Sequence, residues 1–259
     1  MNSPVPPPTN RLPIRMVLRR CVAFLGGGEP AVLIASFLFL ATGFAFVQIA
    51  DAVTDGETNH FDNWAIRALR SPDNPAMPIG PEWLNEMMRD ATALGGYGCL
   101  IFFTAAVAGY LHLDRKKHLA QVLVVSTVSG YLFSSLLKAV FQRPRPDIVP
   151  HLSYVASTSF PSGHSMNAAV VYLTLGTLLA ASVQRTSLKI YVISLALFLT
   201  VTVGFSRVYL GVHYPTDIAA GWMAGIAWAL LCWLVARFLQ RRGQVESPVQ
   251  LPDEQEAMS

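Results

Sequence analysis

Six long apolar runs constrain this chain more than any other feature. They are Ala31–Ala50, Leu94–Leu113, Leu119–Leu137, Met166–Val183, Ile190–Phe205 (extendable through Leu210) and Ile218–Leu239. A membrane-spanning helix needs about 20 such residues, and the runs lack the two-residue alternation of a membrane β-barrel. Because backbone polar groups in lipid must be satisfied internally, helices are the spanning form that remains. We therefore predict an all-α polytopic membrane protein with six transmembrane helices.

The composition agrees with this prediction and narrows the classes of partner. Of the 259 residues, 53% are hydrophobic and 14% are charged, whereas a soluble domain has about 25% charged residues. The net charge of +3 is small, and no basic run resembles a nucleic-acid-binding arm. Cys21, Cys99 and Cys232 do not make a disulfide framework or a metal knuckle. We expect no nucleic-acid partner and no metal site.

The chain divides into three predicted parts. Residues 1–30 are rich in Pro, Arg and Gly and are interpreted as a cytoplasmic N-terminal segment. With the first apolar run they are typical of a signal anchor, since a cleaved signal peptide has a shorter apolar core. Residues 31–240 are predicted to form the six-helix membrane domain. Residues 241–259, with their Pro, Gln and Glu, are typical of a disordered cytoplasmic tail.

Lysine and arginine residues predict the orientation. Four segments hold most of them: the N-terminal segment, the loop 114–118, the loop 184–189 and the end of the sixth run. With six spans, all four fall on one side, which the positive-inside rule makes the cytoplasm. Both termini are then cytoplasmic, and the other side faces the periplasm or exterior of a bacterial plasma membrane.

The first outer loop, residues 51–93, contains two patterns typical of helices. Apolar residues recur at helical spacing over Phe61–Leu69 and again over Trp83–Ala91. Both predict short amphipathic helices on the membrane surface. Such helices serve either as simple interfacial packing or as a side wall that admits a lipid headgroup.

Three polar clusters interrupt the second half of the chain, beside the predicted outer ends of the spans. They are Lys138 with Arg145-Pro146, Pro161-Ser162-Gly163-His164, and Ser206-Arg207 with His213 and Asp217. Two cations held close together favour an anion between them, and arginine offers phosphate a planar fork. Ser162 or Gly163 can cap the helix that follows, and a helix start binds anions.

The third cluster adds an imidazole beside a carboxylate. Asp217 near His213 can fix the tautomer of the ring and leave its other nitrogen free to attack or to accept a proton. A structural His–Asp hydrogen bond is the alternative interpretation. Arg207 near the membrane boundary weakens that alternative, because a cation there needs an anionic partner. Other neighbours in the sequence are Arg143, Asp147, His151 and Tyr209, which are candidates for supporting contacts.

The order and spacing of these clusters resemble the type 2 phosphatidic acid phosphatase superfamily of membrane lipid phosphatases. All three signatures match between Lys138 and Asp217 without a gap or substitution. The resemblance implies that His213 is the nucleophile forming a phosphohistidine, Asp217 its orienting group, and His164 the general acid and later base. It implies that the phosphoryl oxygens are held by Lys138, Arg145, Ser162, Gly163 and Arg207. It also implies a lipid phosphate substrate and no metal or other cofactor.

Several functions remain open at this point. A lipid phosphatase acting on undecaprenyl diphosphate, phosphatidylglycerol phosphate, phosphatidic acid or lipid A phosphates fits the motifs. A phosphotransferase with a lipid acceptor fits the same motifs. A non-catalytic protein that binds or moves anionic lipids would not require the intact His164, His213 and Asp217, and haloperoxidases that share this pocket are soluble. No obligatory protein partner is evident.

Overall fold

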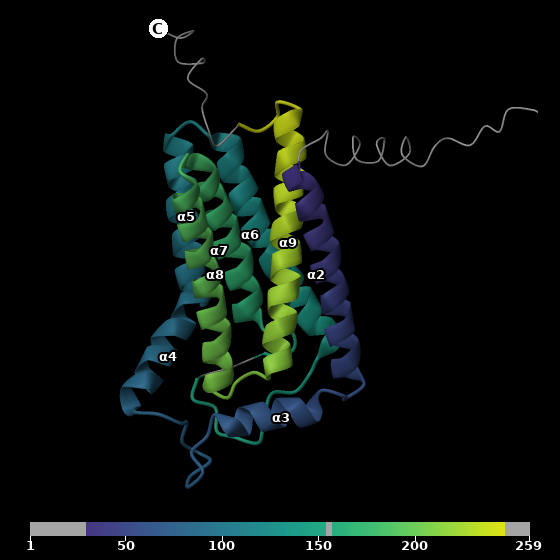
Figure 1. Ribbon diagram of the computed structural model, residues 1–259, viewed down its shortest axis with the longest axis vertical. Helices are drawn as coiled ribbons and strands as arrows, with labels where there is room; N and C mark the ends of the chain where they lie inside the picture. The colour runs from purple at the N-terminus through teal and green to yellow at the C-terminus, as the bar shows by residue number, and fades with distance from the viewer. Residues whose placement is uncertain (1–29, 154–156, 247–259) are drawn as a thin grey trace, which may run out of the picture.

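A computed structural model describes residues 30–153 and 157–246, and its regular elements are helices throughout this part of the chain (Figure 1). They are α2 (Pro30–Thr54), α3 (Asn59–Ala68), α4 (Glu82–Leu94), α5 (Tyr97–Leu113), α6 (Lys117–Phe141), α7 (Gly163–Ser182), α8 (Thr186–Tyr209) and α9 (Pro215–Arg241). The all-α prediction is therefore confirmed for the described residues. The predicted N-terminal segment up to residue 29 and the tail from residue 247 lie outside them.

Five helices are long and apolar enough to cross a membrane: α2, α6, α7, α8 and α9. The pair α4 and α5 qualifies jointly, although it is bent by 49° at a short break. The sequence predicted a span over Leu94–Leu113 and a separate surface helix over Trp83–Ala91. The structure likewise has two helices, which are joined through Gly95 and Gly96, but Leu94 belongs to the first of them. Residues 30–153 and 157–246 therefore contain five candidate spans, or six if the bent pair is one span.

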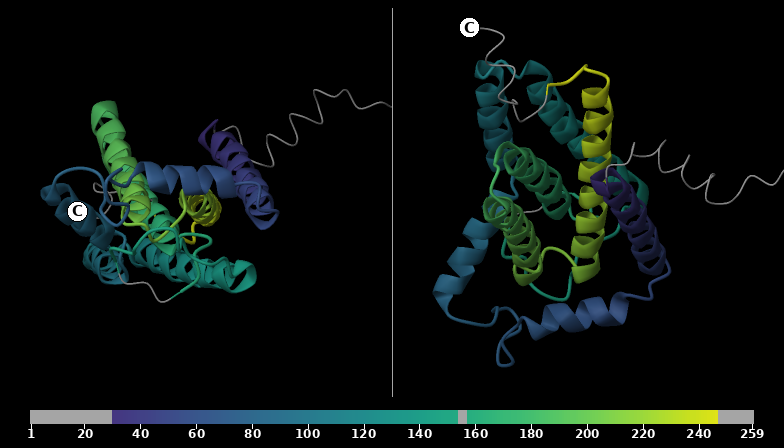
Figure 2. Two further views of the ribbon diagram at one scale, coloured as in Figure 1. Left: turned by 90° about the horizontal axis from the view of Figure 1, so that it is seen from below. Right: turned by 45° about the horizontal axis from the view of Figure 1, so that its top comes forward.

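Helix α7 forms the centre of the bundle and contacts α5, α6, α8 and α9, while α2 packs on the outside of α9 (Figures 1 and 2). Small residues allow α7 and α9 to approach closely. A Cβ atom added to Gly221 of α9 would lie 2.8 Å from the Ser162 carbonyl oxygen and 3.1 Å from Ser165 Cβ. This contact holds the first turn of α7 against the first turns of α9.

Helix α3 crosses the end of the bundle at which α9 begins (Figures 1 and 2). Ile66 is fully buried and packs with Val149, Val208 and Ile218, whereas Phe61 and Trp64 are exposed. Helices thus occur at both positions where the outer loop was predicted to form them. Their placement on a membrane surface stays a prediction.

The sequence places the start of the disordered tail at residue 241, but the structure describes ordered residues as far as Glu246. Helix α9 continues to Arg241, and the chain then turns back so that Val245 is buried beside Leu119. The Glu246 carboxylate accepts hydrogen bonds from the backbone N–H groups of His118 and Leu119 at 3.3 and 3.1 Å. Free N–H groups at a helix start attract an anion. Residues 241–246 therefore belong to the folded domain.

Candidate active site

The three polar clusters meet at one end of the bundle because each stands at the matching end of its helix. Lys138 is in the last turn of α6, and Arg207 is in the last turn of α8. Ser162 caps the start of α7, and Asp217 lies in the first turn of α9. His164 interacts electrostatically with Arg207, Lys138 and Arg145. All eight predicted site residues therefore lie in one region.

His213 and Asp217 form a buried pair. The distance from His213 Nδ1 to Asp217 Oδ2 is 3.3 Å, and both side chains are almost completely inaccessible to solvent. On the other side of the ring, Arg145 Nη1 lies 3.1 Å from His213 Nε2. A guanidinium can only donate, so Nε2 must be the accepting nitrogen and Nδ1 must carry the proton. The unprotonated nitrogen of His213 therefore faces the Arg145 side chain and accepts a hydrogen bond from it.

The environment of His213 keeps its ring neutral. Burial lowers the pKa of His213 to about 3, against the raising effect of Asp217 and with a further lowering effect of Arg145 and Arg207. A neutral imidazole retains the lone pair that nucleophilic attack requires. His213 therefore keeps one unprotonated ring nitrogen at neutral pH.

Three cations lie near the two histidines, and none of them has an ion-pair partner among the described carboxylates. Within the part of the chain that the structure describes, Lys138, Arg145 and Arg207 form no ion pair. Lys138 Nζ donates to the Thr158 carbonyl at 2.6 Å, and Arg145 donates to the carbonyls of Ser157 and Val212, each at 2.6 Å. These neutral acceptors leave the positive charge uncompensated. Such a cluster suits a polyanionic group such as phosphate.

The start of α7 completes the arrangement. The Ser162 N–H donates to the Asp217 carbonyl at 3.0 Å, which ties the start of α7 to α9. The Ser162 hydroxyl accepts from the Ser165 N–H at 3.4 Å. A Cβ atom on Gly163 would lie 3.2 Å from Lys138 Cε. Glycine at this position therefore lets the cationic side chain pass close to the backbone.

Arg143, which sequence reasoning held only as a neighbour, bridges two buried carboxylates. It donates to Asp217 Oδ1 at 2.7 Å and to Asp62 Oδ2 at 2.8 Å. Asp62 in turn accepts from the backbone N–H and hydroxyl of Thr216 at 3.1 and 2.6 Å. Burial acts to lower the pKa of Arg143, but the two carboxylates outweigh it and raise the pKa above its ordinary value. Arg143 thereby connects helix α3, through Asp62, to the His213–Asp217 pair.

The sequence pattern did not identify three further contacts. The Ser159 hydroxyl, fully buried, donates to Asp217 Oδ2 and lies 3.3 Å from His213 Nδ1. Thr92 of α4 accepts from Arg207 Nη1 at 3.0 Å. Asp62, the partner of Arg143, lies one turn before the buried Ile66 on the same face of α3. That spacing was the available signal for Asp62, and Ser159 and Thr92 had none.

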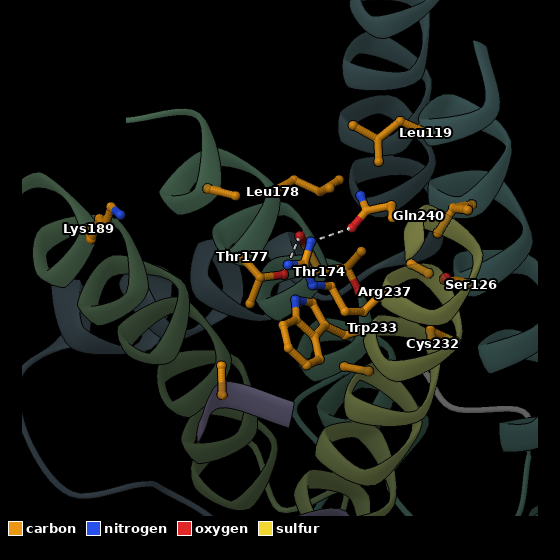
Figure 3. A pocket seen from close by; sticks show the side chains of 15 residues that line it. Leu119, Ser126, Thr174, Thr177, Leu178, Lys189, Cys232, Trp233, Arg237 and Gln240 are labelled. Atoms are coloured by element: carbon orange, nitrogen blue, oxygen red, sulfur yellow. Dashed lines mark hydrogen bonds between the residues drawn. The ribbon is translucent and has the colours of Figure 1, made fainter. Parts of the chain in front are cut away.

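A separate cavity of about 460 Å³ lies at the opposite end of the bundle (Figure 3). It is lined by residues from the start of α6 and α8 and the end of α7 and α9, including Leu119, Lys189, Leu178 and Gln240. The site residues occupy the other ends of the same helices. This cavity is therefore distinct from the candidate active site.

The fold and this site define an all-helical membrane protein that gathers two histidines, a carboxylate and three unpaired cations at one end of its bundle. The family model described as the PAP2 superfamily matches residues 119–241. Phosphatidylglycerophosphatase B of Bacillus subtilis is 37% identical over 164 residues, covering 63% of this chain and 79% of that protein. The chain belongs to the PAP2 superfamily, which confirms the family predicted from the three motifs.

A second relative is similar to this chain in sequence, and a solved structure is similar to it in fold. Lipid A 1-phosphatase of Rhizobium johnstonii is 31% identical over 157 residues, covering 54% of this chain and 60% of that protein. A crystal structure of a transmembrane PAP2-type phosphatidylglycerolphosphate phosphatase from Bacillus subtilis superimposes with a TM-score of 0.72 at 30% identity. The match covers 79% of this chain and 98% of that one.

Proposed function

We propose that the protein is an integral membrane lipid phosphatase that hydrolyses a phosphomonoester or diphosphate of a lipid through a phosphohistidine intermediate, without a metal. The observation that carries this proposal is the contact of the neutral His213 Nε2 with Arg145, one of three cations that lie near the two histidines without an ion-pair partner among the described residues. The relatives' names, which are those of lipid phosphatases, support the substrate class.

In the proposed first step, His213 Nε2 attacks phosphorus and the ester bond to the lipid oxygen breaks. His164 donates a proton to that oxygen, so the lipid alcohol leaves neutral. Asp217 stabilises the positive charge that develops on the His213 ring through its contact with Nδ1. Lys138, Arg145 and Arg207, together with the Ser162 hydroxyl and the Gly163 N–H, hold the phosphoryl oxygens.

In the second step, a water molecule attacks the phosphohistidine. His164, now unprotonated, accepts a proton from this water while the bond between phosphorus and His213 Nε2 breaks. Inorganic phosphate leaves and both histidines return to their starting states. Three fixed cations supply the charge stabilisation that Mg²⁺ gives to other phosphoryl-transfer enzymes.

The proposed location is a bacterial plasma membrane with the site facing the periplasm or exterior and both termini in the cytoplasm. The distribution of lysine and arginine supports this orientation if α4 and α5 form one span, giving six in total. A reporter enzyme fused after Pro150 should then be active outside the cytoplasm. Activity of the reporter only inside would overturn the orientation.

The central experiment measures phosphate release by the protein purified in detergent with EDTA. A panel of lipid phosphates from the classes named above is assayed beside His213→Ala, with His112→Ala at the other end of the bundle as the matched control. We expect turnover without metal, a loss of at least ~10³-fold for His213→Ala, and little change for the control. Radiolabelled substrate should leave an acid-labile phosphoprotein in the wild type. Retained turnover in His213→Ala would sink the phosphohistidine step.

The same assay separates hydrolysis from phosphotransfer. When a lipid alcohol is added as acceptor, a phosphatase should continue to release inorganic phosphate as the main product. Label appearing mainly in the added lipid would favour the phosphotransferase instead.

A further inference from the structure

A second cavity, of about 400 Å³, lies between α5, α6 and α7 beside the candidate active site. Its outermost wall includes Tyr97, whose ring lies 6.4 Å from the His164 ring. Asn167, another wall residue, follows His164 by three positions on α7. Because residues three apart share a helix face, Asn167 lies below His164 by about 4.5 Å along the helix axis. The cavity therefore begins one turn below the proposed general acid.

Two polar atoms in the wall of this cavity have no hydrogen-bond partner. They are Asn167 Oδ1 and Thr127 Oγ1, each almost inaccessible to solvent. Asn167 as a residue is only 5% exposed. Buried polar groups are nearly always paired, so a pair of unpaired ones in one cavity indicates a missing polar partner. The rest of the wall, including Leu100, Val170 and Val171, is apolar.

The open side of the cavity faces the surroundings of the bundle. Ile101, Val128 and Tyr131 line it and are 65%, 54% and 40% exposed. On helices of membrane-spanning length, exposed apolar side chains face lipid. Hydrocarbon can therefore enter this cavity from the bilayer.

We propose that this cavity, named here the leaving-group cavity, binds the lipid alcohol released from the substrate, and that Asn167 and Thr127 recognise oxygen atoms next to the scissile ester. This inference rests on the proposed phosphatase function. In a glycerolipid monophosphate the carbon beside the phosphate-bearing carbon carries an acyl ester, so a carbonyl oxygen lies a few bonds from the scissile oxygen. The separation of the scissile oxygen from this carbonyl oxygen is comparable to the one-turn separation of His164 and Asn167 along α7.

The chemistry of the cavity favours a glycerolipid phosphate over a polyprenyl phosphate. Apart from its one hydroxyl group, the alcohol of a polyprenyl phosphate is hydrocarbon, so it offers no second oxygen to the two polar atoms. An amide carries both a donor and an acceptor, and a hydroxyl can do either. The Asn167 Nδ2 group and the Thr127 hydroxyl can therefore donate to ester carbonyls, and Asn167 Oδ1 can accept from a free hydroxyl of the glycerol unit. The acyl chains then follow the apolar wall into the bilayer.

The test compares Asn167→Leu and Thr127→Val with Thr104→Val on three substrates in mixed micelles: dioleoyl phosphatidic acid, farnesyl phosphate and the soluble ester phenyl phosphate. Thr104 is a suitable control because its hydroxyl is also buried without a partner but lies outside the cavity wall. Removing a hydrogen bond to the bound lipid should lower kcat/KM for phosphatidic acid by ~10-fold relative to the other two substrates. The effect should appear mainly in KM. Thr104→Val should leave the ratio unchanged.

An equal loss on all three substrates would show a structural role for Asn167 and Thr127 and overturn the inference. A binding measurement separates this result from failure of the proposed function. Dioleoylglycerol, the product alcohol, should raise the melting temperature of the wild type more than that of Asn167→Leu, whether or not any lipid phosphate is hydrolysed. An equal shift in both proteins would overturn the inference even if the phosphatase is active.

Discussion

Arg143 donates to Asp217 at 2.7 Å while the same guanidinium bonds Asp62 at 2.8 Å, so the carboxylate behind His213 is held from a helix of the first outer loop. Both carboxylates are completely buried, and the arginine side chain is 10% exposed. The ring of Tyr214 packs against the guanidinium, whose central carbon lies 4.3 Å from the ring centroid. Arg143 therefore controls the position of Asp217 without facing the anion pocket.

Arg143→Gln should impair turnover more than substrate binding. The variant leaves two buried carboxylates without their counter-ion, and breaking a buried pair costs about 3 kcal/mol or more of folding free energy. We expect kcat to fall by at least ~10-fold, because a displaced Asp217 no longer orients His213, with a smaller change in KM. Arg143→Lys should recover only part of kcat, since lysine cannot reproduce the planar fork. Equal kcat in wild type and Arg143→Gln would contradict this assignment.

Thr92→Val should lower the folding stability of the protein, because Arg207 loses a hydrogen-bond acceptor. Valine removes the acceptor of the 3.0 Å bond from Arg207 Nη1, and Arg207 Nε already lacks a partner. A buried donor that loses its partner costs about 1–3 kcal/mol, so the melting temperature in detergent should fall. A small anion that binds in the site, such as vanadate, should recover much of the lost melting temperature by pairing with Arg207. A melting temperature equal to that of the wild type would show that Thr92 is not needed to pair Arg207.

Gly221→Ala should separate the starts of α7 and α9. The added methyl group would lie 2.8 Å from the Ser162 carbonyl oxygen, which is backbone and cannot move aside cheaply. Overpacking of this kind costs about 1–3 kcal/mol, and displacement of Ser162 and His164 should also reduce kcat. Gly109→Ala is the matched control, because nothing lies within 4 Å of the new atom and alanine favours a helix. Equal thermal stability of the two variants would count against close packing at Gly221.

Acid should destabilise the wild type partly through His213. The pKa of this ring is about 3 in the folded protein against an ordinary 6.5. The unfolded chain therefore binds a proton that the folded chain refuses, and stability falls as the pH drops from 6.5 towards 3. His213→Gln removes this contribution, so its melting temperature should change less between pH 7 and pH 4. Parallel pH dependences for the two proteins would be inconsistent with a buried neutral His213.

The sequence places several of the predicted site residues together because they stand at the ends of apolar runs. The lengths of the runs put Lys138, Ser162, Arg207 and Asp217 at helix termini, and the antiparallel order of the spans brings those termini to one end of a bundle. The motif order then indicates the family. The sequence also predicted two separate helices in residues 83–113, but it placed their boundary between Ala91 and Leu94, whereas α4 continues to Leu94 and α5 begins at Tyr97.

By itself, the sequence determined the helical class, the candidate membrane segments and the family. Only the tertiary structure decided which groups surround the His213–Asp217 pair. Asp62 meets Arg143 across 81 residues, and Thr92 meets Arg207 across 115. Periodicity reports which face of a helix is buried, but it carries no information about which distant group that face will meet. The tautomer of His213, the anchor of Asp217 and the unpaired atoms of the leaving-group cavity all depend on such long-range contacts.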